Sequence, residues 1–143
     1  MALFCIMSNN YFNDKLRNME LKYFKLKEFE SPDLPGSGDK MDLAFLQKLD
    51  KCRELAGVPF KITSGFRTAA YNINLGKRGY KIAKNSPHLK GVAADIVAST
   101  SDIRYKIITS ALAVGITRIG IGKTFIHLDT DATKSQNVIW HYY

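Results

Sequence analysis

A histidine and an aspartate stand seven positions apart in the segment Ser-Pro-His-Leu-Lys-Gly-Val-Ala-Ala-Asp, residues 86–95. Imidazole nitrogens and carboxylate oxygens are both good zinc ligands, so His88 and Asp95 supply two of the three that a zinc site needs. The chain has three histidines, and His127 lies in the run Thr-Phe-Ile-His-Leu-Asp, which is typical of a strand. Three such ligands with an open fourth position are the usual set of a catalytic zinc ion, so the sequence predicts such a site.

Each of the three residues also has a structural explanation. Asp95 follows Val92, Ala93 and Ala94, and a carboxylate buried in such an apolar run needs a metal, a cation or several donors. A salt bridge to Arg67 or Lys90 would satisfy it as well as a metal would. His88 alone would be an ordinary surface or structural residue, and His127 alone a hydrogen-bonded core histidine. The combination of all three favours the metal.

Two further residues stand where they could contact a substrate of a zinc enzyme. Such a zinc ion would lower the pKa of its water and polarise a carbonyl group. Arg67 follows Gly65 in a turn after an expected strand, where its guanidinium could hold a substrate carboxylate or stabilise a developing oxyanion. Ser86, two residues before His88, could donate to the substrate or only shape the turn before Pro87.

A general base is harder to find. Zinc hydrolases place a carboxylate near the attacking water, but the residues just before His127 are Lys123, Thr124 and Phe125. Asp129, two residues after His127 in the expected strand, shares its face. Asp129 is therefore predicted either to be the base or to orient a metal ligand, and both roles stay open.

The elements that must position these residues belong to an α+β fold. Leu43, Leu46, Leu49, Cys52 and Leu55 recur at helical spacing and are expected to form one buried face, with Asp39 as the N-cap and Gly57 at the end. The other expected helices are one through residues 71–75 and one that Ser101 caps and Gly115 ends. Strand-like runs cover residues 58–63, 91–98, 117–121, 124–129 and 138–142. Because the last three are closely spaced, we expect a small antiparallel sheet that carries the zinc site and packs with about three helices.

Length and composition favour one globular domain. The chain has 143 residues, 45% hydrophobic and 24% charged, with a formal net charge of +8. Residues 1–18 contain four asparagines and no clear periodicity, so we expect an N-terminal extension before a single domain over residues 19–143. No run is long enough to span a membrane, no signal peptide is evident, and Cys52 is expected to be a buried free thiol. The basic surface favours acidic partners, but no motif indicates nucleic acid.

The motifs together resemble the zinc D-Ala-D-Ala carboxypeptidase family. The residues that carry the resemblance are Ser64-Gly65-Phe66-Arg67-Thr68 with Asn72, Ser86-x-His88-x-x-Gly91-x-Ala93-x-Asp95, Phe125-Ile126-His127-x-Asp129, and Trp140. The resemblance covers roughly residues 24–140. It implies the zinc fold shared with hedgehog N-terminal domains, zinc held by His88, Asp95 and His127, and Arg67 facing the substrate. Many members carry Glu or Asp three residues before the last zinc histidine, whereas this chain has Thr124 there.

The resemblance implies a zinc metallopeptidase that hydrolyses peptide bonds in peptidoglycan stem peptides. Members include D-Ala-D-Ala carboxypeptidases and phage endolysins that cut L-alanoyl-D-glutamate bonds. The expected protein is a monomer that is cytoplasmic in the producing cell or associated with a virion, and that acts on the cell wall in lysis or remodelling. The alternative, prompted by Thr124, is a non-catalytic phage structural or wall-binding module that is stabilised by zinc.

Overall fold

The structure is a computed structural model that describes residues 20–143. The predicted extension over residues 1–18, and Cys5 within it, lie outside the described residues. Within the described part, the predicted α+β class is confirmed, with one sheet of five strands and three α-helices. The α-helices are α2 (Leu43–Ala56), α3 (Ala69–Lys77) and α4 (Ser101–Ala113). The strands are β1 (Ile62–Ser64), β2 (Ala93–Val97), β3 (Arg118–Ile121), β4 (Phe125–Asp129) and β5 (Val138–His141). Three short 3-10 helices are η1 (Leu26–Phe29), η2 (Ser37–Lys40) and η3 (Pro87–Lys90).

The sheet has the strand order β1-β2-β4-β3-β5. The pairs β1–β2, β2–β4 and β3–β4 are antiparallel, as expected. The expectation of an antiparallel sheet is wrong for the last strand, because β5 pairs with β3 in parallel. β5 lies on the far side of β3 from β4. The chain leaves β4 and enters β5 at the same end of the sheet, so β5 runs opposite to β4 and parallel to β3.

The two faces of the sheet have different roles, because successive side chains of a strand point to opposite faces. Ala94 and Ile96 of β2, with Ile126 and Leu128 of β4 and Ile119 of β3, are fully buried in the hydrophobic core. The intervening residues of the same strands therefore share the other face. Across that face, Asp95 of β2 pairs with His127 of β4, and the next residue in the row is Gly120 of β3.

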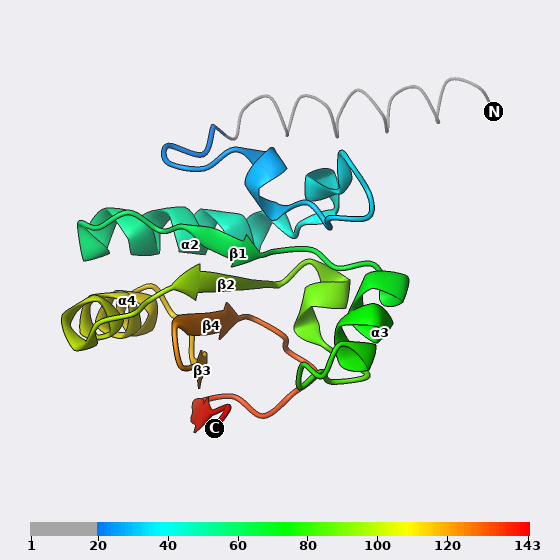
Figure 1. Cartoon of the computed structure of the whole chain (residues 1–143). Helices are drawn as coiled ribbons and strands as arrows, with labels where there is room; N and C mark the ends of the chain where they lie inside the picture. Colours follow the sequence, from blue (N-terminus) through cyan, green and yellow to red (C-terminus); the bar gives the residue numbers. More distant parts are fainter. Residues whose placement is uncertain (1–19) are drawn as a thin grey trace, which may run out of the picture.

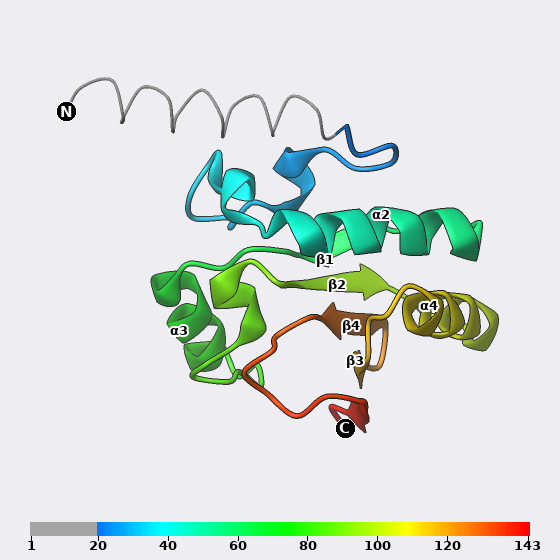
Figure 2. The same cartoon turned by 180° about the vertical axis from the view of Figure 1, so that it is seen from behind.

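Helices cover the core and bracket the sheet. In both views α2 runs alongside β1, while α4 and α3 lie at opposite ends of the strands (Figure 1, and from behind in Figure 2). The expected N-cap Asp39 is wrong: it lies inside η2, and the Asp42 carboxylate accepts from the Phe45 amide instead, at 2.9 Å. Gly57 ends α2 in the left-handed conformation, as expected. No helix among residues 20–143 combines the length and the apolar character that a membrane span requires.

Gly91 fixes the short helix that carries His88. Its backbone is left-handed, with φ of +70°, and its carbonyl accepts from the Asp42 amide at 2.8 Å. A Cβ at this position would lie 2.3 Å from the Lys40 carbonyl oxygen. Gly91 therefore lets η3 lie directly against the start of α2.

We expect Gly91→Ala to lower the free energy of unfolding by about 3 kcal/mol, because the strained backbone and the collision with Lys40 add together. Chemical denaturation measures the loss. Gly79→Ala is the matched control, since Gly79 has φ of +89° but nothing within 4 Å of the added Cβ. The control should lose about 1 kcal/mol. Equal losses in the two variants would contradict the proposed close approach.

Cys52 is a fully buried free thiol on α2, as predicted. Burial raises the pKa of this thiol to about 12. Because the thiolate is the reactive form, we expect a thiol reagent at pH 8 to label Cys52 only as fast as the domain unfolds. Labelling is followed by mass spectrometry in a Cys5→Ser variant, with and without denaturant. Fast labelling in the native state would contradict this prediction.

Candidate metal centre

The structure brings together the three residues predicted to bind metal. One donor atom from each of His88, Asp95 and His127 lies within 4.8 Å of the others, and all three residues are buried. His88 Nε2 is 3.3 Å from Asp95 Oδ1, and His127 Nδ1 is 2.9 Å from the same oxygen. They come from η3, β2 and β4, so the site forms where η3 packs beside two paired strands.

His88 presents its Nε2 atom to the site. Its Nδ1 lies 2.7 Å from the Gly65 carbonyl oxygen, which can only accept a hydrogen bond. Nδ1 therefore holds the hydrogen, and the lone pair of the neutral ring is on Nε2, toward Asp95. The turn after β1 thus orients the first ligand.

His127 presents the other nitrogen. Its Nε2 lies 2.7 Å from Asp129 Oδ2, so the ring donates to that carboxylate and leaves Nδ1 facing Asp95. Asp129 is on the same strand face two residues later, as the sequence predicts. An Asp partner that fixes the tautomer and orientation of a histidine is a common feature of metal sites.

Asp95 pairs with one of the two cations that the sequence left open as its partner. Arg67 donates through Nη2 to Asp95 Oδ2 at 3.1 Å, which turns Oδ1 toward the two histidines. Arg67 is fixed in turn by Ser64 Oγ at 2.8 Å. Lys90 does not pair with Asp95; it forms an ion pair with Asp131 at 3.0 Å.

The donor set fits a zinc ion. Four ligands at about 2.0 Å in a tetrahedron are roughly 3.3 Å apart, close to the separations of 2.9 and 3.3 Å in this site. Burial opposes a charge on His127, but hydrogen bonds to Asp129 and Asp95 outweigh it and raise the pKa of His127 to about 9. The site therefore attracts positive charge at the point where three donor atoms converge. A bound cation would replace the proton that His127 otherwise holds there.

The pKa values of Asp95 and His88 are both lowered, opposite to the change at His127. Burial would raise the pKa of Asp95, but the two histidines hold it well below its ordinary value. Burial lowers the pKa of His88 despite the attraction of Asp95. A carboxylate and a neutral imidazole are the forms in which both residues bind metal.

Arg118 holds Asp129 in place, although it was not among the residues predicted from the sequence. Its Nε donates to Asp129 Oδ1 at 2.6 Å, and the guanidinium also donates to the Ser135 carbonyl. Arg118 and Asp129 are opposite each other in the β3–β4 register, and both are buried. The guanidinium lies 5.2 Å from the Trp140 ring. An arginine between apolar strand residues was the available signal, but its partner depends on the register of β3 with β4.

A cleft of about 950 Å³ opens over the three donors. Arg67, Ser86 and Asp129 line it together with the three donor residues. The Ser86 hydroxyl accepts from the His88 amide at 3.3 Å, so Ser86 shapes the start of η3 and also faces the cleft. Thr124, at the position where the resemblance led us to expect an acidic residue, also lines the cleft.

Aromatic residues of the C-terminal segment form one side of the cleft. The rings of Trp140 and Tyr142 lie 5.6 and 6.3 Å from the His127 ring, between centroids. Gly120 makes this possible, because a Cβ there would lie 2.7 Å from Tyr142 and 2.9 Å from Trp140. Trp140 belongs to the resembling motifs, whereas Tyr142 and Gly120 were not singled out by the sequence.

Comparison with known proteins agrees with this geometry. The family model described as peptidase M15 matches residues 22–129, which is more than half of the chain. No curated protein matches the chain. Among solved structures, the crystal structure of Serratia marcescens L-Ala D-Glu endopeptidase ChiX is similar, with a TM-score of 0.50 and 20% sequence identity. The alignment covers 64% of this chain and 80% of that one, and at this identity it supports the fold alone. The matched region contains all three donor residues, and the chain belongs to the peptidase M15 family of zinc D-Ala-D-Ala carboxypeptidases that its motifs resemble.

Proposed function

We propose that this peptidase is a zinc metallopeptidase that hydrolyses peptide bonds in peptidoglycan stem peptides, as a D-Ala-D-Ala carboxypeptidase or an L-Ala-D-Glu endopeptidase. The convergence of His88 Nε2, Asp95 Oδ1 and His127 Nδ1 at the base of an open cleft carries the proposal. Membership of the family and the fold shared with an endopeptidase support it. Such hydrolysis would serve cell-wall lysis or remodelling, and the protein would act as a monomer.

The three donor atoms would hold the zinc ion. When bound, zinc would polarise the scissile carbonyl and lower the pKa of the attacking water. His88, Asp95 and His127 hold their donor atoms ready for it, because Gly65, Arg67 and Asp129 already occupy the opposite side of each group. This preorganisation reduces the reorganisation that metal binding would otherwise require.

Arg67 and Ser86 would contact the substrate. The Arg67 guanidinium lines the cleft beside Asp95, where it would stabilise negative charge that develops on the scissile carbonyl oxygen. The Ser86 hydroxyl faces the same cleft and would donate a hydrogen bond to the peptide backbone. The sequence assigned the same two residues to substrate binding.

Of the two roles left open for Asp129, we propose that it orients His127. Its Oδ2 accepts from His127, and its Oδ1 accepts from Arg118 and from the Asp131 amide. The residue is 1% exposed. A general base needs a free lone pair directed at the water, and both oxygens of Asp129 are already engaged.

The proposal is tested by measuring metal content and peptide cleavage on the same preparation. We expect one zinc per chain and a defined mass change in purified muropeptides, lost with a chelator and restored by zinc. The masses of the products identify the bond that is cut. If a fully zinc-loaded preparation changes no muropeptide, the proposed activity is wrong.

The engagement of every acidic side chain in the cleft favours a second function, a zinc-stabilised wall-binding module without turnover. Among the described residues that line the cleft, Asp95 and Asp129 are the only ones with acidic side chains, and both are engaged. With Thr124 at the position of the usual acidic residue, no free base is in place. This alternative predicts that zinc raises the melting temperature and that the protein binds cell walls while every muropeptide stays intact.

A further inference from the structure

The wall of the cleft has an excess of positive charge. Six of the described residues that line it are basic and two are acidic. The basic residues are Arg67, Arg78, Lys81, Arg118, Lys123 and Lys134. The acidic residues are Asp95 and Asp129, which form ion pairs with Arg67 and Arg118 respectively. Four cations on the wall therefore remain after the acidic residues are matched.

These four cations come from three separate segments around the cleft. Arg78 and Lys81 follow α3, Lys123 lies in the turn between β3 and β4, and Lys134 precedes β5. Within residues 20–143, none of the four forms an ion pair with a carboxylate. Arg78 lies over the Tyr80 ring at 5.5 Å, and Lys81 donates to the Tyr142 carbonyl at 3.1 Å. Both are thereby held at the wall without being neutralised.

Most of the net positive charge of the chain lies in residues 66–143, which supply nearly all of the residues that line the cleft. Residues 1–65 contain ten basic and nine acidic residues, whereas residues 66–143 contain eleven basic and four acidic ones. Three of those four acidic residues, Asp95, Asp129 and Asp131, are buried and paired with a cation. The remaining one, Asp102, is in the first turn of α4. A cleft with cations on its wall and almost no opposing carboxylates concentrates anions.

We propose that the cleft selects anionic stem peptides by their free carboxylates. The inference rests on the proposed function and names its substrate class: a short peptide with at least two carboxylates near the scissile bond. Amidation removes one negative charge from such a peptide and changes its size very little. The cations then lose an attractive partner, so amidated stems are the poorer substrates.

The test uses two synthetic stem peptides that differ only in whether the glutamate α-carboxyl group is free or amidated. For the zinc-loaded full-length chain we expect kcat/KM to be about tenfold higher for the free acid, mainly through KM, with the difference shrinking as salt is added. Equal kcat/KM values would overturn the inference. Binding of both peptides to the zinc-loaded protein, measured by calorimetry, gives the same comparison without turnover. The absence of cleavage, with tighter binding of the free acid, would contradict the proposed function but support the inference.

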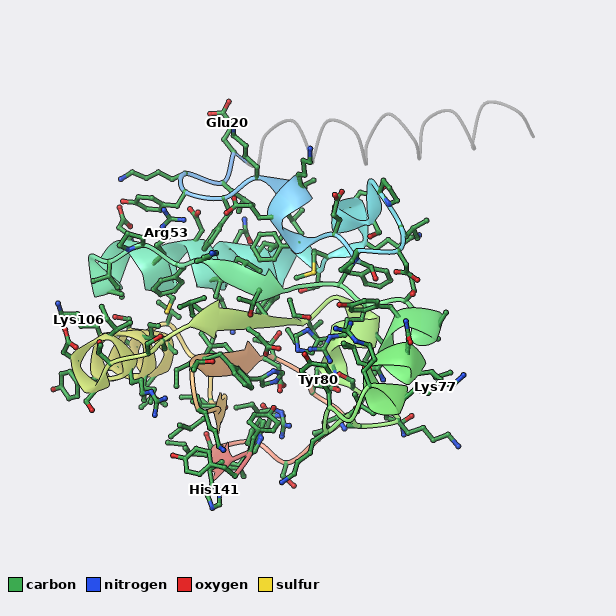
Figure 3. All side chains as sticks on the ribbon, in the orientation of Figure 1. Glu20, Arg53, Lys77, Tyr80, Lys106 and His141 are labelled. Atoms are coloured by element: carbon green, nitrogen blue, oxygen red, sulfur yellow. The ribbon has the colours of Figure 1, made fainter. Side chains whose placement is uncertain are left out.

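Two double variants test whether the preference for the free-acid peptide depends on the cations of the cleft. Lys123→Gln with Lys134→Gln removes two cations of the cleft, and Lys48→Gln with Lys106→Gln removes two exposed lysines outside it. Figure 3 shows Lys106 on α4, at the other end of the sheet from Lys77 on α3. We expect the cleft variant to lose most of its preference for the free acid and the control variant to keep it. Equal losses in both variants, on peptides or on whole cell walls, would mean that overall charge attracts a wall polymer, and would overturn the inference.

Discussion

His88→Ala should abolish zinc binding and peptidase activity together. Two remaining ligands do not hold a catalytic zinc ion, and the metal's effects on water and on the carbonyl are then lost, so we expect activity to fall more than about a thousandfold. Added zinc should raise the melting temperature of the wild type, because a ligand that binds only the folded state stabilises it. It should leave the melting temperature of the variant unchanged.

His141→Ala is the control for this experiment. His141 is an exposed residue of β5 and is not among the three donors (Figure 3). The variant should keep the zinc content, the zinc-dependent rise in melting temperature and the activity of the wild type. If His88→Ala keeps its zinc-dependent stabilisation, the three-donor centre is wrong, whatever the activity.

Arg118→Leu should have the second large effect, on stability and on metal affinity at once. The change leaves the Asp129 carboxylate buried and without its cation, which costs about 3–5 kcal/mol of folding free energy. Asp129 then no longer holds the His127 ring firmly, so we expect the affinity for zinc to fall about 10- to 100-fold. Denaturation with chelator present measures the first effect, and competition with a chromophoric chelator measures the second.

Two variants separate these effects. Arg118→Lys keeps the charge but not the fork of donors, so it should recover part of the stability and little of the zinc affinity. Arg104→Leu is the matched control, because Arg104 donates to the carbonyls of Ala98, Gly122 and Lys123, away from the metal centre. It should lose stability without any change in zinc affinity. A normal zinc affinity in Arg118→Leu would contradict the positioning role.

Local sequence patterns predicted the three α-helices and the residues of the candidate metal centre, but not the helix starts: Thr100, and not the expected Ser101, is the N-cap of α4. Helical spacing and Gly57 predicted α2 and its buried Cys52, but Leu55, which the same pattern placed on the buried face, is exposed because it lies in the last turn. The motif from Ser86 to Asp95 and the run around His127 supplied all three donors that the structure places together. Asp39 was wrong as an N-cap, because residues 37–40 form η2 and α2 begins only after Asp42, whose carboxylate caps it.

The direction of β5 and the identity of each partner could not be read from the sequence. The close spacing of the strands suggested an antiparallel sheet throughout. Instead, the chain crosses from β4 to the far side of β3, where β5 pairs with β3 in parallel. From the sequence, Arg67 and Lys90 were equal candidates as the cation that pairs with Asp95. In the folded structure Arg67 forms an ion pair with Asp95, and Lys90 forms one with Asp131.

The sequence by itself determined which residues could bind a metal, because ligand chemistry belongs to residue types and local motifs carry it. Only the tertiary structure decided which nitrogen of each histidine faces the site. Gly65 selects Nε2 of His88, and Asp129, held by Arg118 across the β3–β4 register, selects Nδ1 of His127. The physical reason is that a histidine's tautomer is set by the hydrogen bond on its other nitrogen, and these partners meet only when the strands pair.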